Sequence, residues 1–119
     1  MTNIKTTQHF KLEFFDKYVI VEGITGAIVD REIAQITLKS IMDHYDGKNF
    51  TIISNRVNEY ILDLDAYSSK ILKKVKSFAV VSTNPKVKER ALLEQDKYDH
   101  AFAFFSCIEE AKNWAESFN

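Results

Sequence analysis

The sequence predicts an α/β domain built on a single-layer mixed, mostly parallel five-stranded sheet with four helices, in the order ββαβαβαβα. Short runs rich in β-branched and aromatic residues alternate with longer segments whose apolar residues recur at helical spacing. Residues 78–81 are apolar at consecutive positions, as a strand covered on both faces requires. Strands that alternate with helices favour parallel pairing through right-handed crossovers.

The first part of the chain predicts a hairpin followed by a helix. Apolar residues alternate or run together over residues 10–24, around a turn at Asp16 and Lys17. Asp30 is a good N-cap for a helix over residues 31–45. One stripe of that helix is apolar and should face the sheet: Ala34, Leu38, Ile41, Met42 and Tyr45.

The middle of the chain is less regular. Residues 50–53 predict a third strand, and residues 54–65 predict a loop with a short extended piece. Beyond Asp65, apolar residues at helical spacing predict a second helix, which ends near three lysines. The residues of this stripe are Tyr67, Ile71, Leu72 and Val75.

The last part predicts two further strand–helix pairs. A central strand at residues 78–81 is followed by a helix that begins at Pro85 and runs to about Gln95. The last strand covers residues 101–105, and Ser106 with Glu109 forms a capping box before the last helix. Its apolar stripe should be buried against the sheet: Cys107, Ile108, Ala111, Trp114, Ala115 and Phe118.

The composition predicts one domain over residues 1–119, with residues 1–7 as a flexible tail. Hydrophobic residues make up 45% of the 119 residues, and there are only 3 Gly and 1 Pro. Lys and Arg number 16 against 17 Asp and Glu, so the net charge is −1. Because no positive field attracts phosphates, we do not expect nucleic acid as a partner.

The chain shows no sign of secretion or membrane insertion. Cys107 is the only cysteine, so no intramolecular disulfide forms, which fits a reducing compartment. The first residues lack an apolar signal core, and no apolar run approaches the ~18 residues needed to span a bilayer. We therefore expect a cytoplasmic protein.

Catalytic and metal-binding patterns are missing from the sequence. His9, His44 and His100 have no second ligand at metal spacing. No nucleophile has a base beside it, and there is no phosphate loop. The sequence therefore predicts a protein that is not an enzyme and holds neither a metal nor a cofactor.

The chain closes on a Phe-rich strand and then Ile108-Glu109-Glu110-Ala111, with Trp114 three residues later. This ending and the element order over nearly the whole chain resemble the SpoIIAA-like branch of the STAS (sulfate transporter and anti-sigma factor antagonist) fold. The resemblance implies a small cytoplasmic module that regulates by binding a protein partner or by self-association as a homodimer, and it implies no catalytic residues. The alternative is a carrier or sensor of a small apolar or lipid-like ligand, with the many aromatic residues around a pocket.

The resemblance also concerns a phosphorylation site. In anti-sigma antagonist members, a serine at the start of the helix after the third strand is phosphorylated beside an Asp-Ser-Ser-Gly type sequence. This chain has Leu64-Asp65-Ala66-Tyr67-Ser68-Ser69 after a longer loop and lacks the glycine. The segment around Ser68 and Ser69 therefore matches the family's phosphorylation site only in part.

Polar residues follow the predicted parallel strands where each one ends. In open α/β sheets, ligands collect outside these carboxyl ends. We therefore predict a ligand or partner rim there, in which Arg56 is the group that would grip a carboxylate or phosphate. The same residue types also serve as ordinary caps and turns. The rim comprises Thr25, Gly26, Ser54, Asn55, Arg56, Ser82, Thr83 and Asn84.

The first helix offers a second candidate surface. Ile33 and Ile36 project away from its inward stripe, among polar neighbours. Two apolar residues on an outer helical face favour a contact surface, such as that of a homodimer.

Overall fold

The computed structural model describes residues 3–62, 75–98 and 100–118. Its helices are α1 (Arg31–Tyr45), α2 (Pro85–Asp96) and α3 (Ile108–Phe118). Its strands are β1 (Asn3–Thr6), β2 (Phe10–Phe14), β3 (Tyr18–Gly23), β4 (Ile28–Val29), β5 (Thr51–Asn55), β6 (Ile61–Leu62), β7 (Ser77–Val81) and β8 (Ala101–Phe105). The helix predicted after Asp65 lies outside the described residues except for Val75, which is buried and not helical.

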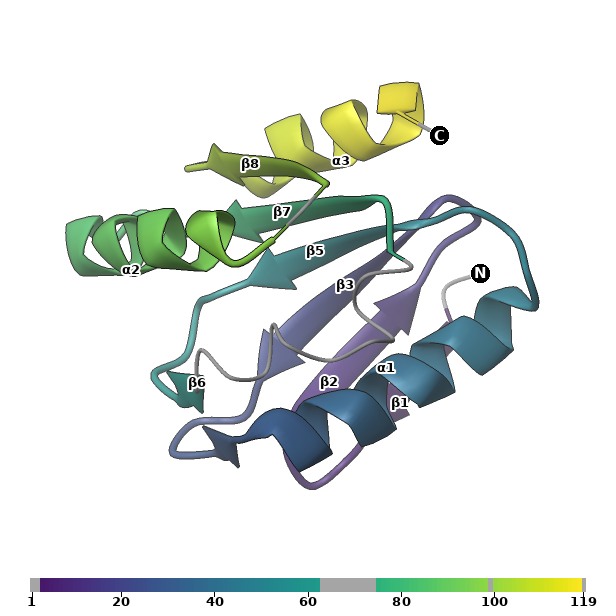
Figure 1. The fold of residues 1–119 in the computed structure, drawn as a ribbon, viewed down its shortest axis with the longest axis horizontal. Helices are drawn as coiled ribbons and strands as arrows, with labels where there is room; N and C mark the ends of the chain where they lie inside the picture. The colour runs from purple at the N-terminus through teal and green to yellow at the C-terminus, as the bar shows by residue number, and fades with distance from the viewer. Residues whose placement is uncertain (1–2, 63–74, 99, 119) are drawn as a thin grey trace.

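The main sheet has six strands in the order β1-β2-β3-β5-β7-β8 (Figure 1). β1, β2 and β3 pair antiparallel, whereas β3, β5, β7 and β8 pair parallel. This confirms the mixed, mostly parallel sheet. It has one strand more than predicted, because residues 3–6 pair with β2 as an edge strand instead of forming a tail. Lys5 Nζ also donates to Ser40 Oγ on α1 at 2.8 Å.

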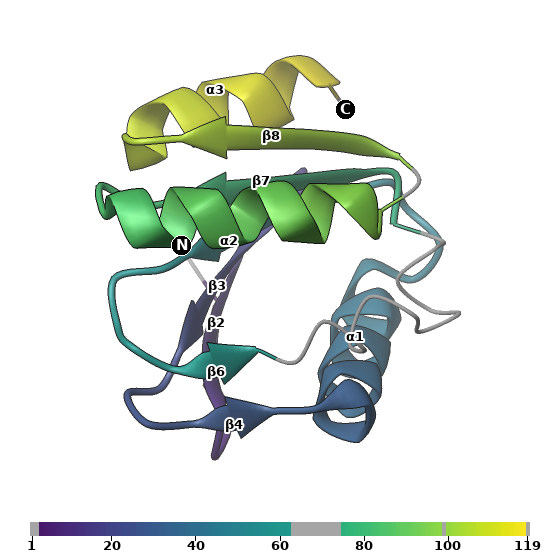
Figure 2. The same cartoon turned by 60° about the vertical axis from the view of Figure 1, so that its left-hand side comes forward.

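Helices cover both faces of this sheet (Figures 1 and 2). α1 and α2 pack on one face, over a core that includes Leu12, Ile52 and Val80. α3 packs on the other face, where the buried residues are Tyr18, Ile20, Ile53, Ala79, Val81, Ala111 and Ala115. All five residues of β7 are buried, which confirms the prediction of a central strand covered on both sides.

α1 has the predicted bounds, and its cap is Asp30, whose side chain accepts from the Ile33 amide at 2.9 Å. Leu38, Ile41 and Tyr45 are buried, and Ala34 and Met42 pack partly buried against the same core. The predicted inward stripe is therefore confirmed.

Tyr45 joins the end of α1 to the turn between β2 and β3. Its Oη lies 2.7 Å from the Phe15 carbonyl oxygen and 2.6 Å from that of Tyr18, so its one proton is shared between two acceptors. Its ring stacks on Phe50, with 4.4 Å between the ring centroids. Burial raises the pKa of the Tyr45 hydroxyl well above its usual value.

A cap at Ser106 predicts that the last helix begins at Cys107, but α3 begins one residue later. Its first residue is Ile108, so Cys107 occupies the position before the helix and is exposed. The prediction of a buried Cys107 was wrong for this reason. Ala111 and Ala115 are fully buried, as predicted, but Trp114 is only partly buried because it packs against Phe105 of the edge strand β8, with ring centroids 5.8 Å apart.

Candidate functional site

A cleft of about 1220 Å³ opens where the parallel strands β3, β5, β7 and β8 end. We call it the strand-end cleft. Segments after all four of these strands line it, with the starts of α2 and α3. The sheet thus brings together residues far apart in the sequence, including seven of the eight predicted rim residues: Thr25, Gly26, Asn55, Arg56, Ser82, Thr83 and Asn84.

One wall of the cleft is a small parallel sheet of β4 and β6, which lies in the lower half of Figure 2, below α2. The Gly26 amide donates to the Glu59 carbonyl at 2.8 Å, and the Ile61 amide donates to the Ala27 carbonyl at 2.9 Å. Gly26 has φ of 81°, which favours glycine at this turn. The wall carries two large exposed apolar side chains that line the cleft, Val57 and Ile61.

Tyr60 fixes this wall to the end of β3. A Cβ atom on Gly23 would lie 2.4 Å from the Tyr60 ring, so the ring occupies the space that a side chain would need. Asn58 Nδ2 donates to the Gly23 carbonyl at 3.1 Å. The absence of a side chain at Gly23 therefore positions the wall of the cleft.

We expect Gly23→Val to displace Tyr60 and to lower the free energy of unfolding by about 1 to 3 kcal/mol, the usual effect of overpacking. Urea denaturation measures this change. The matched control combines Gly23→Val with Tyr60→Ala, which removes the ring. Gly47→Val is a poorer control, because Gly47 has positive φ. Gly23→Val should cost much less stability in the Tyr60→Ala background than in the wild type, and an equal loss in both backgrounds would contradict the proposed clash.

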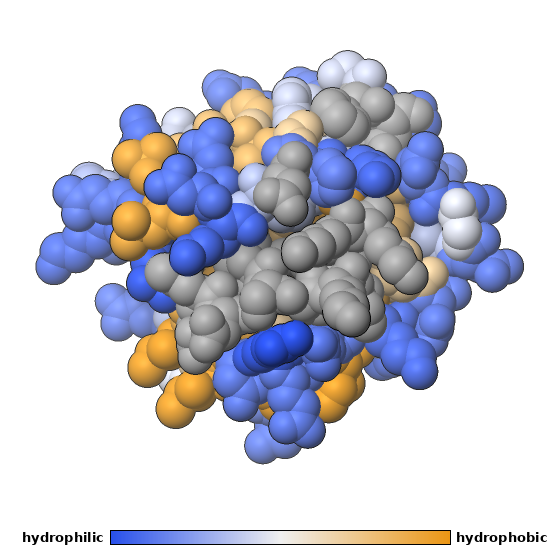
Figure 3. Space-filling view, viewed as in Figure 1, coloured by the Kyte–Doolittle hydropathy of each residue, from blue (hydrophilic) through white to orange (hydrophobic). Residues whose placement is uncertain are grey.

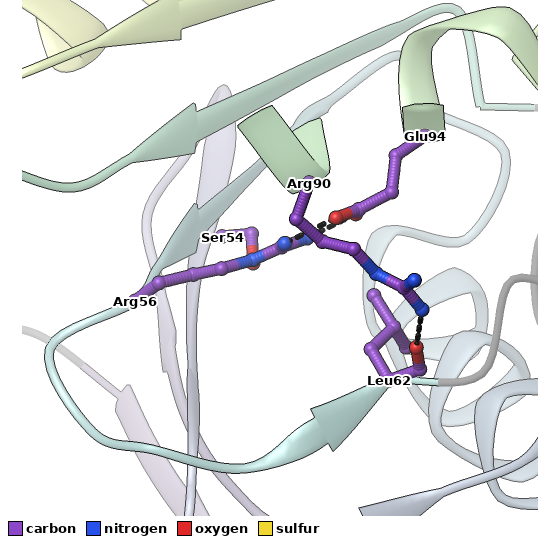
Figure 4. Close-up of polar contacts among 5 residues, drawn as sticks. All are labelled: Ser54, Arg56, Leu62, Arg90 and Glu94. Carbon is purple, nitrogen blue, oxygen red and sulfur yellow. Dashed lines mark hydrogen bonds and ion pairs between the residues drawn. The ribbon is translucent and has the colours of Figure 1, made fainter. Parts of the chain in front are cut away.

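Arg56 is not the exposed, anion-gripping residue that we predicted. Its side chain is only 7% exposed and forms a bidentate ion pair with Glu94 of α2, which is 0% exposed. Its Nε also donates to Ser54 Oγ at 3.0 Å (Figure 4). Ser54, the eighth rim residue, is buried beneath it. This network ties β5 to α2 at the floor of the cleft.

Sequence reasoning missed Glu94 because a glutamate on a helix is usually exposed. The inner face of α2 carries Val87, Ala91, Glu94 and, just beyond the helix, Tyr98, at spacings of four, three and four residues. Leu92 and Leu93 of the same helix are exposed instead. The sequence did carry one signal of its burial: Glu94 lies on the same helical face as Val87 and Ala91.

The start of α2 has no amide left for an anion among its first residues. Asn84 Oδ1 accepts from the Lys86 amide at 2.9 Å, and the Asn84 carbonyl accepts from Val87 at 3.1 Å. The Asn84 amide donates to Ser82 Oγ at 3.1 Å, and Pro85 has no N–H. Two of the predicted rim residues, Ser82 and Asn84, are thus already used as turn and cap.

A second arginine in the cleft also serves the fold. Arg90 Nη2 donates to the Leu62 carbonyl at 2.5 Å, which ties α2 to the β4–β6 wall (Figure 4). Arg56 and Arg90 both line the cleft, and both guanidinium groups bond to protein atoms.

The other predicted surfaces are only partly as expected. Ile36 is 63% exposed, but Ile33 packs partly buried against the core of the α1 face, so its outward orientation was wrong. Its side chain packs against the same core as Ala34 and Met42. Ser68 and Ser69 lie outside the described residues.

Across residues 3–62, 75–98 and 100–118, no group of three His, Cys, Asp or Glu side chains is placed to hold a metal ion. In the same part of the chain, no helix has the length and apolar content needed to cross a membrane.

Neither a protein-family model nor a curated protein sequence matches this chain. Its fold is similar to that of a solved structure from Shewanella loihica PV-4, an uncharacterised protein of the DUF3478 family with a SpoIIAA-like fold. The two superpose with a TM-score of 0.58 over 97% of this chain and 92% of that chain, at 16% sequence identity. The chain therefore has a SpoIIAA-like fold, as the sequence predicted.

Proposed function

We propose that this protein is a non-enzymatic binding module of STAS type that holds a segment of a protein partner in the strand-end cleft. The observation that carries the proposal is the chemistry of the cleft: amide and hydroxyl side chains lie beside exposed apolar ones, Val57 and Ile61. A polypeptide segment offers both backbone hydrogen-bonding groups and apolar side chains, so it fits such a surface.

An anion is a poorer occupant. Arg56 is already paired with Glu94, and the amides at the start of α2 are already bonded. The Arg56 guanidinium and the first amides of α2, groups of the kinds that usually hold a phosphate, are therefore engaged with protein atoms. Lys86 is the remaining cation among the described residues that line the cleft, and one lysine gives a weak site.

A lipid-like ligand is also less well supported. The apolar cavity between α1 and the sheet, lined by Phe10, Leu38 and Phe78 among others, has a volume of about 70 Å³. Ligand pockets usually have about 300 to 1,000 Å³. In the described part of the chain, the aromatic rings fill the core, as the stacked pairs Tyr45 with Phe50 and Phe78 with Phe102 illustrate.

The side chains of the cleft also favour binding over catalysis. The described residues that line it include no histidine, cysteine or aspartate. Glu59 is the one exposed carboxylate among them, and general acid–base catalysis needs a second positioned group.

A random peptide library displayed on phage tests the proposal, because it needs no known partner. We expect enriched peptides that bind the wild-type protein with affinity in the micromolar range and at least tenfold more weakly to Val57→Glu and Ile61→Glu, since each change places a charge where an apolar contact forms. Both side chains are exposed, 65% and 61%, so neither change should disturb the fold.

Ile36→Glu is the matched control, because Ile36 is equally exposed but lies on α1, outside the cleft. Its affinity for the peptides should equal that of the wild type. Selection of no peptide, or of peptides that bind the cleft variants and the wild type alike, would contradict a peptide site in the cleft. Saturable binding of inorganic phosphate, lost in Lys86→Ala, would instead favour an anion site.

A further inference from the structure

The strand β8 is an apolar edge of the main sheet. Its sequence is Ala-Phe-Ala-Phe-Phe, each residue is half-buried, and its neighbour in the sheet is β7. Figure 1 shows β8 at the end of the sheet, between α2 and α3. An edge strand presents a row of backbone N–H and C=O groups that can pair with another strand.

The two edges of the sheet differ. At the opposite edge, β1 is fully exposed and carries Lys5, a charge of the kind that keeps edge strands from pairing. β8 has no charged residue, no proline and no bulge. Proteins that expose a long, flat and apolar edge use it for pairing or aggregate through it.

Apolar side chains also flank the β8 edge on both layers. On α2, Lys88 Nζ lies 5.9 Å from the centre of the Phe104 ring. Leu92 is one helical turn further on, so it lies on the same side of α2, beside β8, and is 56% exposed. On the other layer, Trp114 of α3 packs against Phe105 at the end of β8. Figure 3 shows hydrophobic side chains over α2.

We infer that β8 pairs with β8 of a second copy of this chain, antiparallel about a two-fold axis at Ala103, to give one continuous sheet across a homodimer. In this register Phe102 lies opposite Phe104 of the other copy, so the apolar sequence is complementary to itself. The two copies of Leu92 then meet across the axis. A two-fold contact of this kind closes the assembly at two copies and covers both apolar edges.

Two charged residues of α2 are placed to pair across the same two-fold axis. Lys88 lies toward its N-terminal end and Asp96 at its C-terminal end, eight residues apart on either side of Leu92. α2 and its symmetry copy run antiparallel, so the two-fold axis brings Lys88 of one copy level with Asp96 of the other. Opposite charges at this position favour a second copy as the occupant.

The available area suits a weak dimer. A five-residue strand is roughly 17 Å long, and one sheet with a helix layer on each side is roughly 30 Å wide. The contact then buries roughly 500 Å² on each copy, or about 1,000 Å² in total, which is near the lower limit for a specific interface. We therefore expect a dissociation constant in the micromolar range.

Sedimentation velocity of the full chain over micromolar to submillimolar concentrations tests this dimer. We expect the wild type to shift from monomer to dimer and Leu92→Glu to weaken the dimer by at least tenfold, because two like charges then face each other at the axis. Leu93→Glu is the matched control, since Leu93 is 51% exposed on the same helix but faces away from β8. It should dimerise like the wild type.

A charge exchange tests the register. Lys88→Glu and Asp96→Lys should each weaken the dimer several-fold, and the double variant should recover most of the wild-type affinity, because the opposite charges are restored. Circular dichroism and thermal melting of each variant check that the monomer is folded. A wild type that stays monomeric, a dimer that Leu92→Glu leaves intact, or a dimer lost through Ile36→Glu on α1 would overturn the inference.

Discussion

Replacing Glu94 with alanine should lower the free energy of unfolding by about 3 to 5 kcal/mol, because the change leaves the Arg56 guanidinium buried without its partner. Such a loss is a large fraction of the roughly 5 to 15 kcal/mol that stabilises a typical domain. Guanidinium chloride denaturation followed by circular dichroism measures it. Arg56→Ala should be destabilising to a similar degree, since it removes the ion-pair partner of the buried Glu94 carboxylate.

Two further variants separate the ion pair from a general effect of changing α2. Glu89→Ala, on the exposed side of the same helix, should change stability by less than about 0.5 kcal/mol. Arg56→Met combined with Glu94→Leu should be clearly more stable than either alanine variant, because apolar side chains of similar size leave no buried charge. A loss below about 1 kcal/mol for Glu94→Ala would contradict this prediction, because a loss that small is typical of an ion pair exposed to water.

Tyr45→Ala should also cost about 3 to 5 kcal/mol, because it removes a buried ring and its stacking on Phe50 and leaves a cavity at the end of α1. Tyr45→Phe keeps the ring and removes the hydroxyl that the Phe15 and Tyr18 carbonyls share, so its loss should be about 1 kcal/mol. Urea denaturation of both variants measures the difference. Equal losses for the two variants would assign the whole effect to the hydroxyl and contradict the role given to the ring.

The pH dependence gives a second readout of the same residue. The pKa of Tyr45 is raised in the folded state by burial, so folding favours the neutral hydroxyl. This contribution is fully present below about pH 10, where the unfolded tyrosine is also neutral, and is lost as the pH rises further. Above about pH 10, the wild type should therefore lose up to about 1.4 kcal/mol more per pH unit than Tyr45→Phe. Parallel curves for the two proteins would contradict a buried hydroxyl.

Local signals were enough to predict most of the fold. Asp30 marks the start of α1, and the all-apolar run of β7 indicates a strand covered on both faces. Residues 3–6 form a short segment with one apolar residue, Ile4, and their pairing with β2 depends on a contact at the sheet edge, so no local pattern revealed β1. Cys107 was misplaced because α3 begins one residue later than the capping box predicts, so Cys107 lies outside the helix and off its apolar stripe.

The position of the site was also predictable, whereas its chemistry was not. Parallel strands end at one edge, so the residues after β5 and β7 had to meet there. That Arg56 turns to Glu94 and not to solvent depends on the phase of α2 against the sheet, which is a tertiary property. The pairing removes Arg56 as the group expected to grip a carboxylate or phosphate, and the protein partner that the resemblance implied is the occupant that we propose.

The most direct test of the binding function is a two-dimensional amide NMR titration of the uniformly labelled protein with a phage-selected peptide. We predict that the largest chemical-shift changes fall on residues 25–26, 55–62 and 81–87, which line the strand-end cleft, and that Val57→Glu abolishes them. Changes centred on α1 around Ile36 or on the exposed side of α3, with the cleft unperturbed, would contradict the proposal that the cleft is the binding site.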